Sequence, residues 1–222
     1  MIIFTIIKEE STRCPGKNFR EIISGVPLWK HFLRKFSDSK IFIDTDSLRL
    51  ISEIASDDEF KNVNAYMRLP EHINDYNPTN EMFERFLDEY EIGEDVPLVY
   101  THITAPFLRE PTLRDAVDRF ARAYPHYDSA ASCVKEHNFA YVRNGDKYLP
   151  VNFNPQEIVR SQDLPPIVFL SHGFYVTTKK MFKKYRSRIG PNPMLIDVDG
   201  VESFDIDTEA DWDKAVEIAH GL

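Results

Sequence analysis

Short apolar runs alternate along the chain with segments in which hydrophobic residues recur every three or four positions. The apolar runs contain β-branched, aromatic or small residues and favour strands. They are Met1–Ile7, Lys40–Asp44, Val63–Met67, Pro97–Thr101, Ser129–Val134 and Met194–Val198. Between them, hydrophobic residues share one helical face within residues 28–36, 48–54, 82–87 and 113–120. The alternation predicts a three-layer α/β fold, with a mostly parallel sheet covered on both faces and ligands at the carboxyl ends of its strands.

The pattern changes after residue 134. Two strand-like runs, Phe139–Arg143 and Lys147–Val151, flank Asn144 and Gly145, and Asn-Gly is a strong signal for a tight hairpin turn. Aromatic residues are frequent in this part of the chain. We therefore expect residues 138–176 to form an inserted β-hairpin region that serves as a subunit contact or a lid.

Two further features follow the hairpin. The strand-like runs Pro166–Leu170 and Gly173–Val176 predict a second arm. Near the end of the chain, Thr208 and Asp211 have the spacing of a capping box, in which each side chain binds a backbone N–H of the other. We expect this box to start a helix over Glu209–His220.

Composition narrows the range of functions. The 222 residues carry 27 Lys and Arg against 36 Asp and Glu, so the net charge is −9, and 42% of residues are hydrophobic. An acidic chain lacks the positive field that nucleic acid or anionic lipid attracts, and we expect neither as a partner. Cys14 and Cys133 are too few for a disulfide framework, and no apolar run approaches the roughly 20 residues of a membrane span. We expect a single cytoplasmic domain over residues 1–222.

The loop after the first strand concentrates polar chemistry. Residues 8–18 contain the cations Lys8, Arg13 and Lys17, two hydroxyl side chains and a Pro-Gly turn. In an α/β sheet such a loop can hold a polyphosphate through backbone N–H groups and the dipole of the following helix. The spacing matches neither the P-loop nor the dinucleotide-binding fingerprint. A solvated surface loop is the alternative interpretation.

Two pairs of carboxylates have the same form. Asp205 and Asp207 stand one residue apart directly before the last helix, where they can bind a hard cation with its phosphate oxygens. The alternative is that Asp207 caps the helix and Asp205 faces water. Asp44 and Asp46 allow the same two interpretations. They also form the Asp-x-Asp motif of glycosyltransferases that consume a nucleotide sugar, which is a rival functional class.

Basic residues gather between residues 179 and 188, where six Lys or Arg side chains occur in ten positions. This run permits a nucleic-acid or import function, but in an acidic protein we interpret it as the solvated face of a helix. His102, at the end of a predicted strand, is either a substrate contact or a hydrogen-bonded structural histidine.

Six segments, taken in order, match the pattern of one known family. They are Lys8-Glu9-Glu10-Ser11-Thr12-Arg13-Cys14-Pro15-Gly16-Lys17-Asn18, Gly25-Val26-Pro27-Leu28, Thr45-Asp46-Ser47, Thr104-Ala105-Pro106-Phe107-Leu108-Arg109, Arg160-Ser161-Gln162-Asp163-Leu164-Pro165-Pro166 and Asp205-Ile206-Asp207-Thr208. Together they resemble the cytidylyltransferases that activate acidic sugars, the family of CMP-sialic acid synthetase, with CMP-Kdo synthetase as a cousin. The resemblance covers nearly the whole chain.

The resemblance implies a Rossmann-like nucleotidyltransferase fold and a step of nucleotide-sugar biosynthesis. The anomeric hydroxyl of an acidic sugar attacks the α-phosphate of CTP, giving a CMP-sugar and pyrophosphate with Mg²⁺. It implies that Lys8, Lys17 and Asp207 are catalytic and that the nucleotide is held by Lys8, Ser11, Lys17, Asn18, Thr45 and Asp46. Asp207 is then a metal ligand, with Asp205 as a second ligand or as the group that orients the attacking hydroxyl.

The same resemblance places a second set of residues toward the sugar, namely His102, Thr104, Arg109, Arg160, Gln162 and Ser171. His102 and Ser171 differ from the family pattern, so the chain predicts an acidic sugar without selecting sialic acid over another sugar that bears an anion. It also implies a homodimer in which Arg160 and Gln162 act across the interface. An inactive nucleotide-binding relative is a further alternative because Glu9 and Glu10 enter the phosphate loop; we expect both to point outward.

Overall fold

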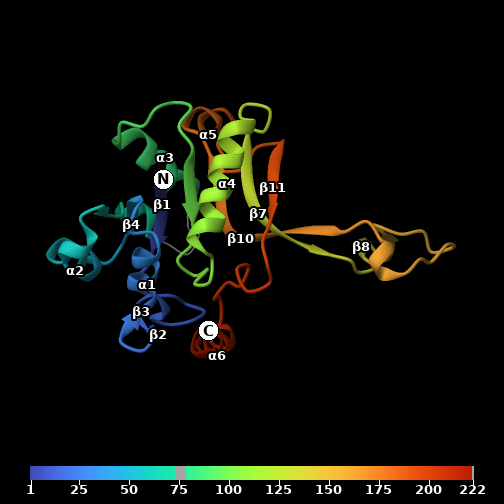
Figure 1. Ribbon diagram of the computed structural model, residues 1–222, viewed down its shortest axis with the longest axis horizontal. Coiled ribbons are helices and arrows are strands. Elements are labelled where there is room, and N and C mark those ends of the chain that lie inside the picture. The colour runs from blue at the N-terminus through green and yellow to red at the C-terminus, as the bar shows by residue number, and fades with distance from the viewer. Residues whose placement is uncertain (74–78, 222) are drawn as a thin grey trace.

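The computed structural model describes residues 1–73 and 79–221. Its central sheet has seven strands in the order β11-β7-β10-β6-β1-β4-β5. The strands are β1 (Ile2–Ile7), β4 (Lys40–Thr45), β5 (Val63–Met67), β6 (Leu98–Thr101), β7 (Ser129–Glu136), β10 (Ile167–Thr177) and β11 (Pro193–Asp197). Only β10 among these described strands runs antiparallel to its neighbours (Figure 1). The predicted mostly parallel sheet is confirmed.

Helices cover both faces of this sheet. They are α1 (Leu28–Lys35), α2 (Leu48–Ser56), α3 (Thr79–Glu89), α4 (Glu110–Ala123), α5 (Lys179–Tyr185) and α6 (Glu209–Gly221). Alternation along β1 sends Ile3 and Ile7 to the core beneath α1, α2, α4 and α6, whereas Phe4 packs with α3 and α5. The predicted three layers therefore follow directly from the alternation of apolar side chains.

Short elements complete the body of the molecule. Two small strands, β2 (Glu21–Ile23) and β3 (Val26–Pro27), pair ahead of α1. The 3₁₀ turns of the described residues are η1 (Lys17–Phe19), η2 (Asp58–Phe60) and η3 (Pro70–His72) in the body, and η4 (Ser161–Asp163) outside it. No helix among the described residues combines the length and apolar character needed to cross a bilayer.

One expectation is wrong at β10. The two runs predicted as a second arm belong to a single strand, which enters the sheet between β6 and β7. The register of β10 against β7 shifts between Leu170 and Tyr175, and the strand continues on both sides of the shift. Within it, the Ser132 hydroxyl accepts a hydrogen bond from the Phe174 N–H at 3.1 Å. A polar side chain on β7 thus replaces a ladder contact that a regular strand would make.

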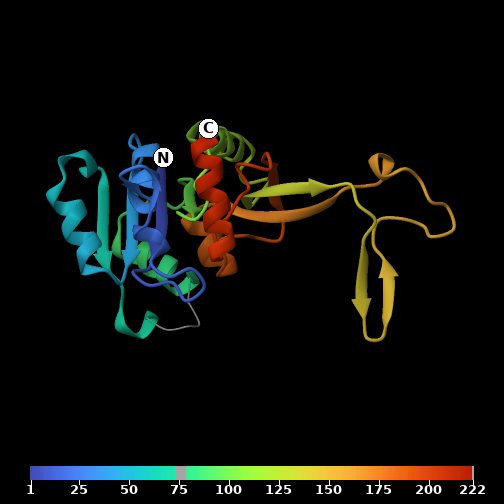
Figure 2. The same ribbon diagram turned by 90° about the horizontal axis from the view of Figure 1, so that it is seen from below.

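An arm, residues 135–170, projects from one side of the body (Figures 1 and 2). The ends of β7 and β10 form its base, and the hairpin of β8 (Tyr141–Asn144) and β9 (Lys147–Pro150) lies beyond them. Gly145 takes a φ of 62° in the turn, and because Asn144 pairs with Lys147 in the ladder, the two turn residues are Gly145 and Asp146 rather than Asn144 and Gly145. The predicted hairpin is confirmed.

Candidate functional site

The loop after β1 folds against the segment that precedes α6. Two nitrogens of the Arg13 guanidinium lie 2.9 Å from the two carboxylate oxygens of Asp207, across 194 residues of sequence. The Lys17 ammonium donates to the backbone carbonyl of Ile206. The two segments that concentrate polar chemistry in the sequence therefore meet in one place.

Charges in this place compensate one another. Burial lowers the pKa of the Lys17 ammonium, and the carboxylates of Asp205 and Asp207 oppose that shift. Burial raises the pKa of Asp205, and Asp207 adds to the rise, while a hydrogen bond from Thr104 and the charge of Lys17 oppose it. The lysine and the two carboxylates thus form one electrostatic unit.

The capping box settles which carboxylate starts α6. The Asp211 N–H donates to the Thr208 hydroxyl at 3.3 Å, and the Thr208 N–H donates to the Asp211 carboxylate at 2.8 Å. Asp211 and Thr208 therefore cap the helix, and the Asp207 carboxylate contacts Arg13 instead. The alternative in which Asp207 is the helix cap is wrong.

Asp205 and Asp207 suit a hard cation that arrives with its own ligands. Among residues 1–73 and 79–221, no three His, Cys, Asp or Glu side chains are grouped to hold a metal ion. Mg²⁺ commonly uses only one or two protein carboxylates and completes its shell with phosphate oxygens and water. The donor set therefore fits Mg²⁺ bound to a nucleotide, on the condition that Arg13 leaves Asp207.

Two hydrogen bonds and a left-handed glycine fix the loop after β1. The Asn18 side-chain amide donates to the Lys8 carbonyl at 2.7 Å, and the Glu9 N–H donates to the Asp46 carboxylate at 2.7 Å. Gly16, at a φ of 64°, starts the turn that leads into η1. The Asn18 carboxamide oxygen is buried without a hydrogen-bond partner among the described residues. The loop backbone is thus fixed, and the Asn18 carboxamide oxygen remains able to accept a hydrogen bond from a ligand.

The remaining nucleotide-facing candidates lie along the same edge. Lys8 and Ser11 are half-buried in the loop, and Thr45 is buried at the end of β4, where its hydroxyl accepts from the Ser47 N–H at 3.1 Å. Glu10 is exposed, as expected, whereas Glu9 is half-buried beside Arg49, whose pKa its charge helps to raise. The structure therefore brings the six predicted nucleotide-facing residues to one end of β1 and β4.

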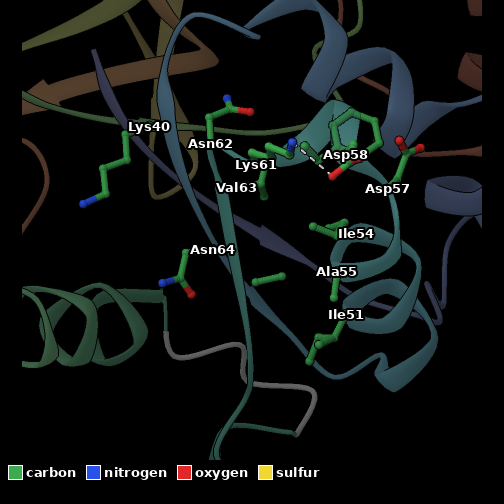
Figure 3. Close-up of a pocket in the computed structure, with 12 residues that line it drawn as sticks. Lys40, Ile51, Ile54, Ala55, Asp57, Asp58, Lys61, Asn62, Val63 and Asn64 are labelled. Carbon is green, nitrogen blue, oxygen red and sulfur yellow. Dashed lines mark ion pairs between the residues drawn. The ribbon is translucent and has the colours of Figure 1, made fainter.

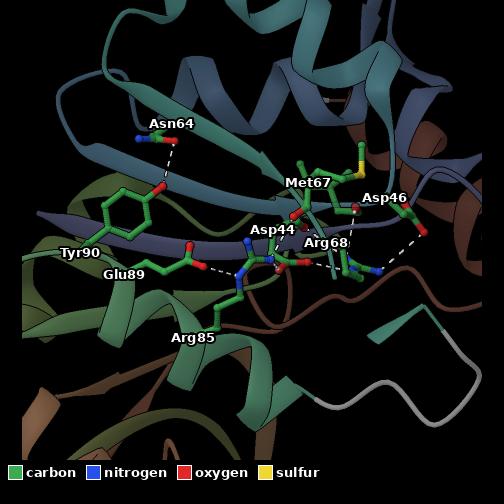
Figure 4. Close-up of polar contacts among 9 residues, drawn as sticks. Asp44, Asp46, Asn64, Met67, Arg68, Arg85, Glu89 and Tyr90 are labelled. Atoms are coloured by element: carbon green, nitrogen blue, oxygen red, sulfur yellow. Dashed lines mark hydrogen bonds and ion pairs between the residues drawn. The ribbon is translucent and has the colours of Figure 1, made fainter. Parts of the chain in front are cut away.

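Sequence inspection missed Arg68, which follows β5 at this edge. Its side chain and that of Asp44 are both fully buried, and Arg68 Nε lies 2.6 Å from Asp44 Oδ1 (Figure 4). Arg68 Nη2 donates to the Asp44 carbonyl at 3.2 Å, and Nη1 lies 3.6 Å from Asp46 Oδ2. The sequence feature that could have identified Arg68 is its position directly after the strand-like run Val63–Met67.

This buried pair bears on the rival glycosyltransferase interpretation. An Asp-x-Asp motif needs accessible carboxylates to hold a metal, but Arg68 engages Asp44, and Arg85 Nη1 lies 3.9 Å from its other oxygen. Burial raises the pKa of Asp44, and the two guanidinium groups oppose that rise. Asp44 is consequently part of the fold rather than a metal ligand.

Three of the predicted sugar-facing residues lie just after β6 or in β10, and one of them, Thr104, interacts with Asp205. Thr104 donates to the Asp205 carboxylate, and its carbonyl accepts the Ile206 N–H at 2.9 Å. Burial, followed by the charge of Arg188, lowers the pKa of half-buried His102 to about 3, so its imidazole is neutral at physiological pH. Ser171 donates to the Ser132 hydroxyl at 2.8 Å in the irregular part of β10.

The other three lie elsewhere in the chain. Arg109, at the start of α4, binds Glu202 at 2.9 Å and Asp199 at 2.8 Å, so its guanidinium secures the loop before α6. Arg160 pairs with Asp163 at 2.7 Å on the arm, which also carries Gln162 and points away from the body (Figure 2). Within one chain these residues do not join the others, and their contact with substrate stays a prediction.

A hollow of about 560 Å³ lies apart from this edge, between α2 and the edge strand β5 (Figure 3). Ile51 and Ile54 line one side, and Lys61 pairs with Asp58 at 3.2 Å within it. Lys40, at the opposite end of β4 from Asp46, also lines the hollow. Its walls carry no residue of the loop after β1, so it is separate from the site.

Comparisons with known proteins agree with this geometry. A sequence model of the family described as cytidylyltransferase matches residues 8–217. N-acylneuraminate cytidylyltransferase of Streptococcus agalactiae serotype III is 22% identical over 205 residues, which cover 89% of this chain and 48% of that protein. The chain thus spans about half the length of the curated relatives it matches.

Solved structures share the fold. A CMP:2-keto-3-deoxy-manno-octonic acid synthetase complexed with CTP aligns over 100% of this chain and 99% of its own, with a TM-score of 0.67 and 17% identity. Francisella tularensis 2-C-methyl-D-erythritol 4-phosphate cytidylyltransferase aligns over 97% of this chain and 98% of its own, with a TM-score of 0.64 and 12% identity.

Proposed function

This chain belongs to the cytidylyltransferase family, and on that premise we propose that it transfers CMP from CTP to a hydroxyl of an acidic sugar, releasing pyrophosphate. The observation that carries the proposal is the meeting of Arg13 and Lys17 with Asp205 and Asp207. Cations for a polyphosphate and carboxylates for its metal stand together there, as nucleotidyl transfer requires. The names of the acylneuraminate relative and the octonic acid synthetase support an acidic sugar as the acceptor.

In the proposed reaction, an acceptor hydroxyl oxygen attacks the α-phosphorus of CTP. One oxygen–phosphorus bond forms, the bond from the α-phosphorus to the bridging oxygen breaks, and pyrophosphate departs. Lys8 and Lys17 bind the triphosphate and neutralise charge on the departing group. Asp205, which burial makes a stronger base, accepts the hydroxyl proton.

Asp207 would hold Mg²⁺ that enters with the nucleotide, and Asp205 beside it stays available to the attacking hydroxyl. The ion would supply further neutralisation of the departing pyrophosphate. Arg13 is then free to leave Asp207 and to bind a phosphate oxygen, because its guanidinium is exposed and loses its partner.

Pyrophosphate production tests the proposed activity. The four common nucleoside triphosphates are each combined with a panel of acceptors that includes N-acylneuraminate, 2-keto-3-deoxy-manno-octonic acid and a phosphorylated polyol. We expect pyrophosphate only with CTP and an acidic sugar. Equal turnover of all four nucleotides, or no turnover with any acidic sugar, would reject the proposal, and turnover of CTP with the polyol would reassign the acceptor.

We also propose that the protein is a homodimer built on the arm. Large hydrophobic side chains are exposed along it, namely Phe139, Tyr141, Val142, Tyr148, Leu149, Val151, Ile158, Val159, Val168, Phe169 and Leu170. Phe153 is half-buried instead, because Phe139 and Tyr141 pack edge-on against its ring. A two-stranded hairpin cannot bury such a surface alone.

Light scattering at micromolar concentration tests the dimer, whose interface should bury on the order of 1,600 Å² or more. A fully active monomer would reject both the dimer and a shared site. The finer proposal is that Arg160 and Gln162 reach the acceptor pocket of the partner subunit. It predicts that Arg160→Ala raises the KM for the acceptor. A dimer whose kinetics are unchanged by that substitution would reject only the shared site.

A further inference from the structure

Arg188, in the loop between α5 and β11, is a half-buried cation that lies on two aromatic rings. Its guanidinium carbon is 4.8 Å from the centre of the Tyr100 ring and 4.6 Å from that of Tyr175. The two tyrosines are almost wholly buried and face each other across neighbouring strands. Contact with both rings therefore restricts the Arg188 guanidinium to fewer conformations than an arginine exposed on the surface would have.

Two neighbouring basic residues have carboxylate partners, whereas Arg188 has none in the described part of the chain. Arg186 lies 2.9 Å from Glu84, and Lys183 lies 3.0 Å from Asp88. No Asp or Glu oxygen within residues 1–73 and 79–221 comes within ion-pair distance of Arg188. Cation–π contact offsets only part of the cost of desolvating a guanidinium. A group held in this way is suited to an anionic ligand, which would supply the missing charge.

Two histidines extend this cluster through the same tyrosines. The His102 ring packs edge-on against the Tyr100 ring at 4.9 Å, and a hydrogen bond of 2.9 Å joins His172 Nδ1 to the Tyr175 hydroxyl. Arg188, His102 and His172 therefore each contact Tyr100 or Tyr175.

His172 is held in a strained backbone conformation. Its φ of 57° lies in the left-handed region, which is uncommon for a residue other than glycine. The strain is maintained by the next residue, because the Thr101 hydroxyl donates to the Gly173 carbonyl at 2.6 Å and fixes the irregular turn of β10. Such strain is typical of functional positions, and here it aims an exposed imidazole beside Tyr175.

The cluster adjoins the transfer site. His102 lies two residues before Thr104, whose carbonyl accepts the Ile206 N–H at 2.9 Å, and the charge of Lys17 acts on both His102 and Asp205. The Arg188 and Lys17 cations therefore both act on the His102 imidazole, whose segment also leads to the carboxylate that we place beside the attacking hydroxyl. An acceptor bound there would have its reacting end at Asp205 and another part at Arg188.

We propose that Arg188, assisted by His102 and His172, binds an oxyanion carried by the acceptor, either a carboxylate or a phosphate; this assignment rests on the proposed cytidylyl transfer. The planar guanidinium presents two N–H groups to two oxygens of such a group. His102 adds an uncharged N–H donor. Arg188 would then distinguish acceptors that carry an anion from neutral sugars.

Imidazole NMR of the full chain, labelled with ¹⁵N-histidine, tests the assignment. Inorganic phosphate and acetate are titrated separately, each with and without magnesium-CTP. We expect saturable shifts of the His102 and His172 signals that persist when CTP is bound. Stronger binding of acetate would assign a carboxylate, and stronger binding of phosphate would assign a phosphate.

Arg188→Met should raise the dissociation constant of the preferred probe by about tenfold or more, as expected for the loss of a charged hydrogen-bond donor. Arg186→Met is the matched control and should leave that constant unchanged. If Arg188→Met does not fold, Arg188→Lys is used instead, because lysine keeps the positive charge but lacks the paired N–H donors of the guanidinium. Arg188→Lys should weaken binding several-fold.

Three results would overturn the assignment: no saturable shift with either probe, equal affinity in the Arg188 and Arg186 variants, or displacement of the probe by CTP. Displacement would place the oxyanion site in the triphosphate pocket. Failure of the proposed function is separately visible, since CTP would then neither bind in calorimetry nor release pyrophosphate with any acceptor.

Discussion

The body and the arm place their hydrophobic side chains in opposite ways. In the body, each face of the sheet meets helices, and residues such as Phe4 and Phe86 pack with ring centres 5.0 Å apart and no exposure. On the arm, Tyr148 is 65% exposed and Ile158 is 71% exposed. The body can therefore fold on contacts within one chain, whereas the arm needs a second surface to cover it.

Polar residues show the same contrast. Buried charges of the body have partners close by, as with Arg68 and Asp44, whereas the arm pairs Arg160 with a carboxylate only three residues away. Loss of a body contact should therefore lower the stability of the chain or stop its chemistry. Loss of an arm contact should alter assembly and leave the body folded.

The largest expected effect is on the buried ion pair. Arg68→Met leaves the Asp44 carboxylate buried without its partner, so the free energy of unfolding should fall by about 3–5 kcal/mol. Chemical denaturation measures the change. Arg49→Met, which removes an exposed pair with Glu53 and a cation–π contact with Phe19, is the control and should cost about 1 kcal/mol or less. Equal losses in the two variants would contradict the role of burial.

The next effect is on turnover. Asp207→Asn should slow pyrophosphate release about 100- to 1,000-fold while the melting temperature stays near that of the parent, since Asp207 is not the cap of α6. Asp213→Asn, an exposed change within α6, is the matched control. A fully active Asp207→Asn enzyme would remove this carboxylate from the chemistry.

Substitutions on the hairpin should change the free energy of dimer dissociation by a smaller amount and leave the folding of the body unchanged. The double substitution Val142→Asp and Tyr148→Asp places two like charges on the exposed hairpin, and we expect dimer dissociation to be favoured by about 2–3 kcal/mol. Sedimentation at several concentrations measures this shift. The unfolding transition of the body should not move, and a variant that lost stability without dissociating would contradict the division between body and arm.

The effect that is smallest near neutral pH is a dependence of stability on pH. The pKa of His102 is lowered to about 3, so between pH 3 and about 6.5 the unfolded chain binds a proton that the folded chain does not. This group therefore contributes stability above pH 6.5 that is lost as the pH falls, by up to about 1.4 kcal/mol per pH unit. His102→Gln should flatten the acid limb of an unfolding curve, and exposed His126→Gln should leave it unchanged.

Local chemistry made much of the fold predictable. The alternation in β1, the helical faces of α1 to α4, the Asn-Gly turn and the Thr208 capping box each depend on residues close in sequence. The sequence also located the loop after β1 and the Asp205–Asp207 pair as the chemical segments. These segments carry residue types whose spacing suits phosphate and metal.

Packing between distant segments was beyond the reach of such patterns. The insertion of β10 between β6 and β7 depends on Ser132 filling a break in the ladder, and periodicity along β10 carries no record of that partner. The meeting of Arg13 with Asp207 depends on how α6 docks, 194 residues later. Arg68 was missed because a buried arginine requires a partner that only the sheet supplies.

The basic run of residues 179–188 shows which properties of a charged residue the sequence determines and which depend on tertiary packing. Composition by itself determined an acidic chain with one local concentration of positive charge, and it correctly placed Lys183 and Lys184 on the exposed side of a helix. It could not distinguish Lys183, which pairs with Asp88, from Arg188, which lies on Tyr100 and Tyr175. The environment of a charge is set by the side chains packed around it, and those come from β6 and β10, far away in the sequence.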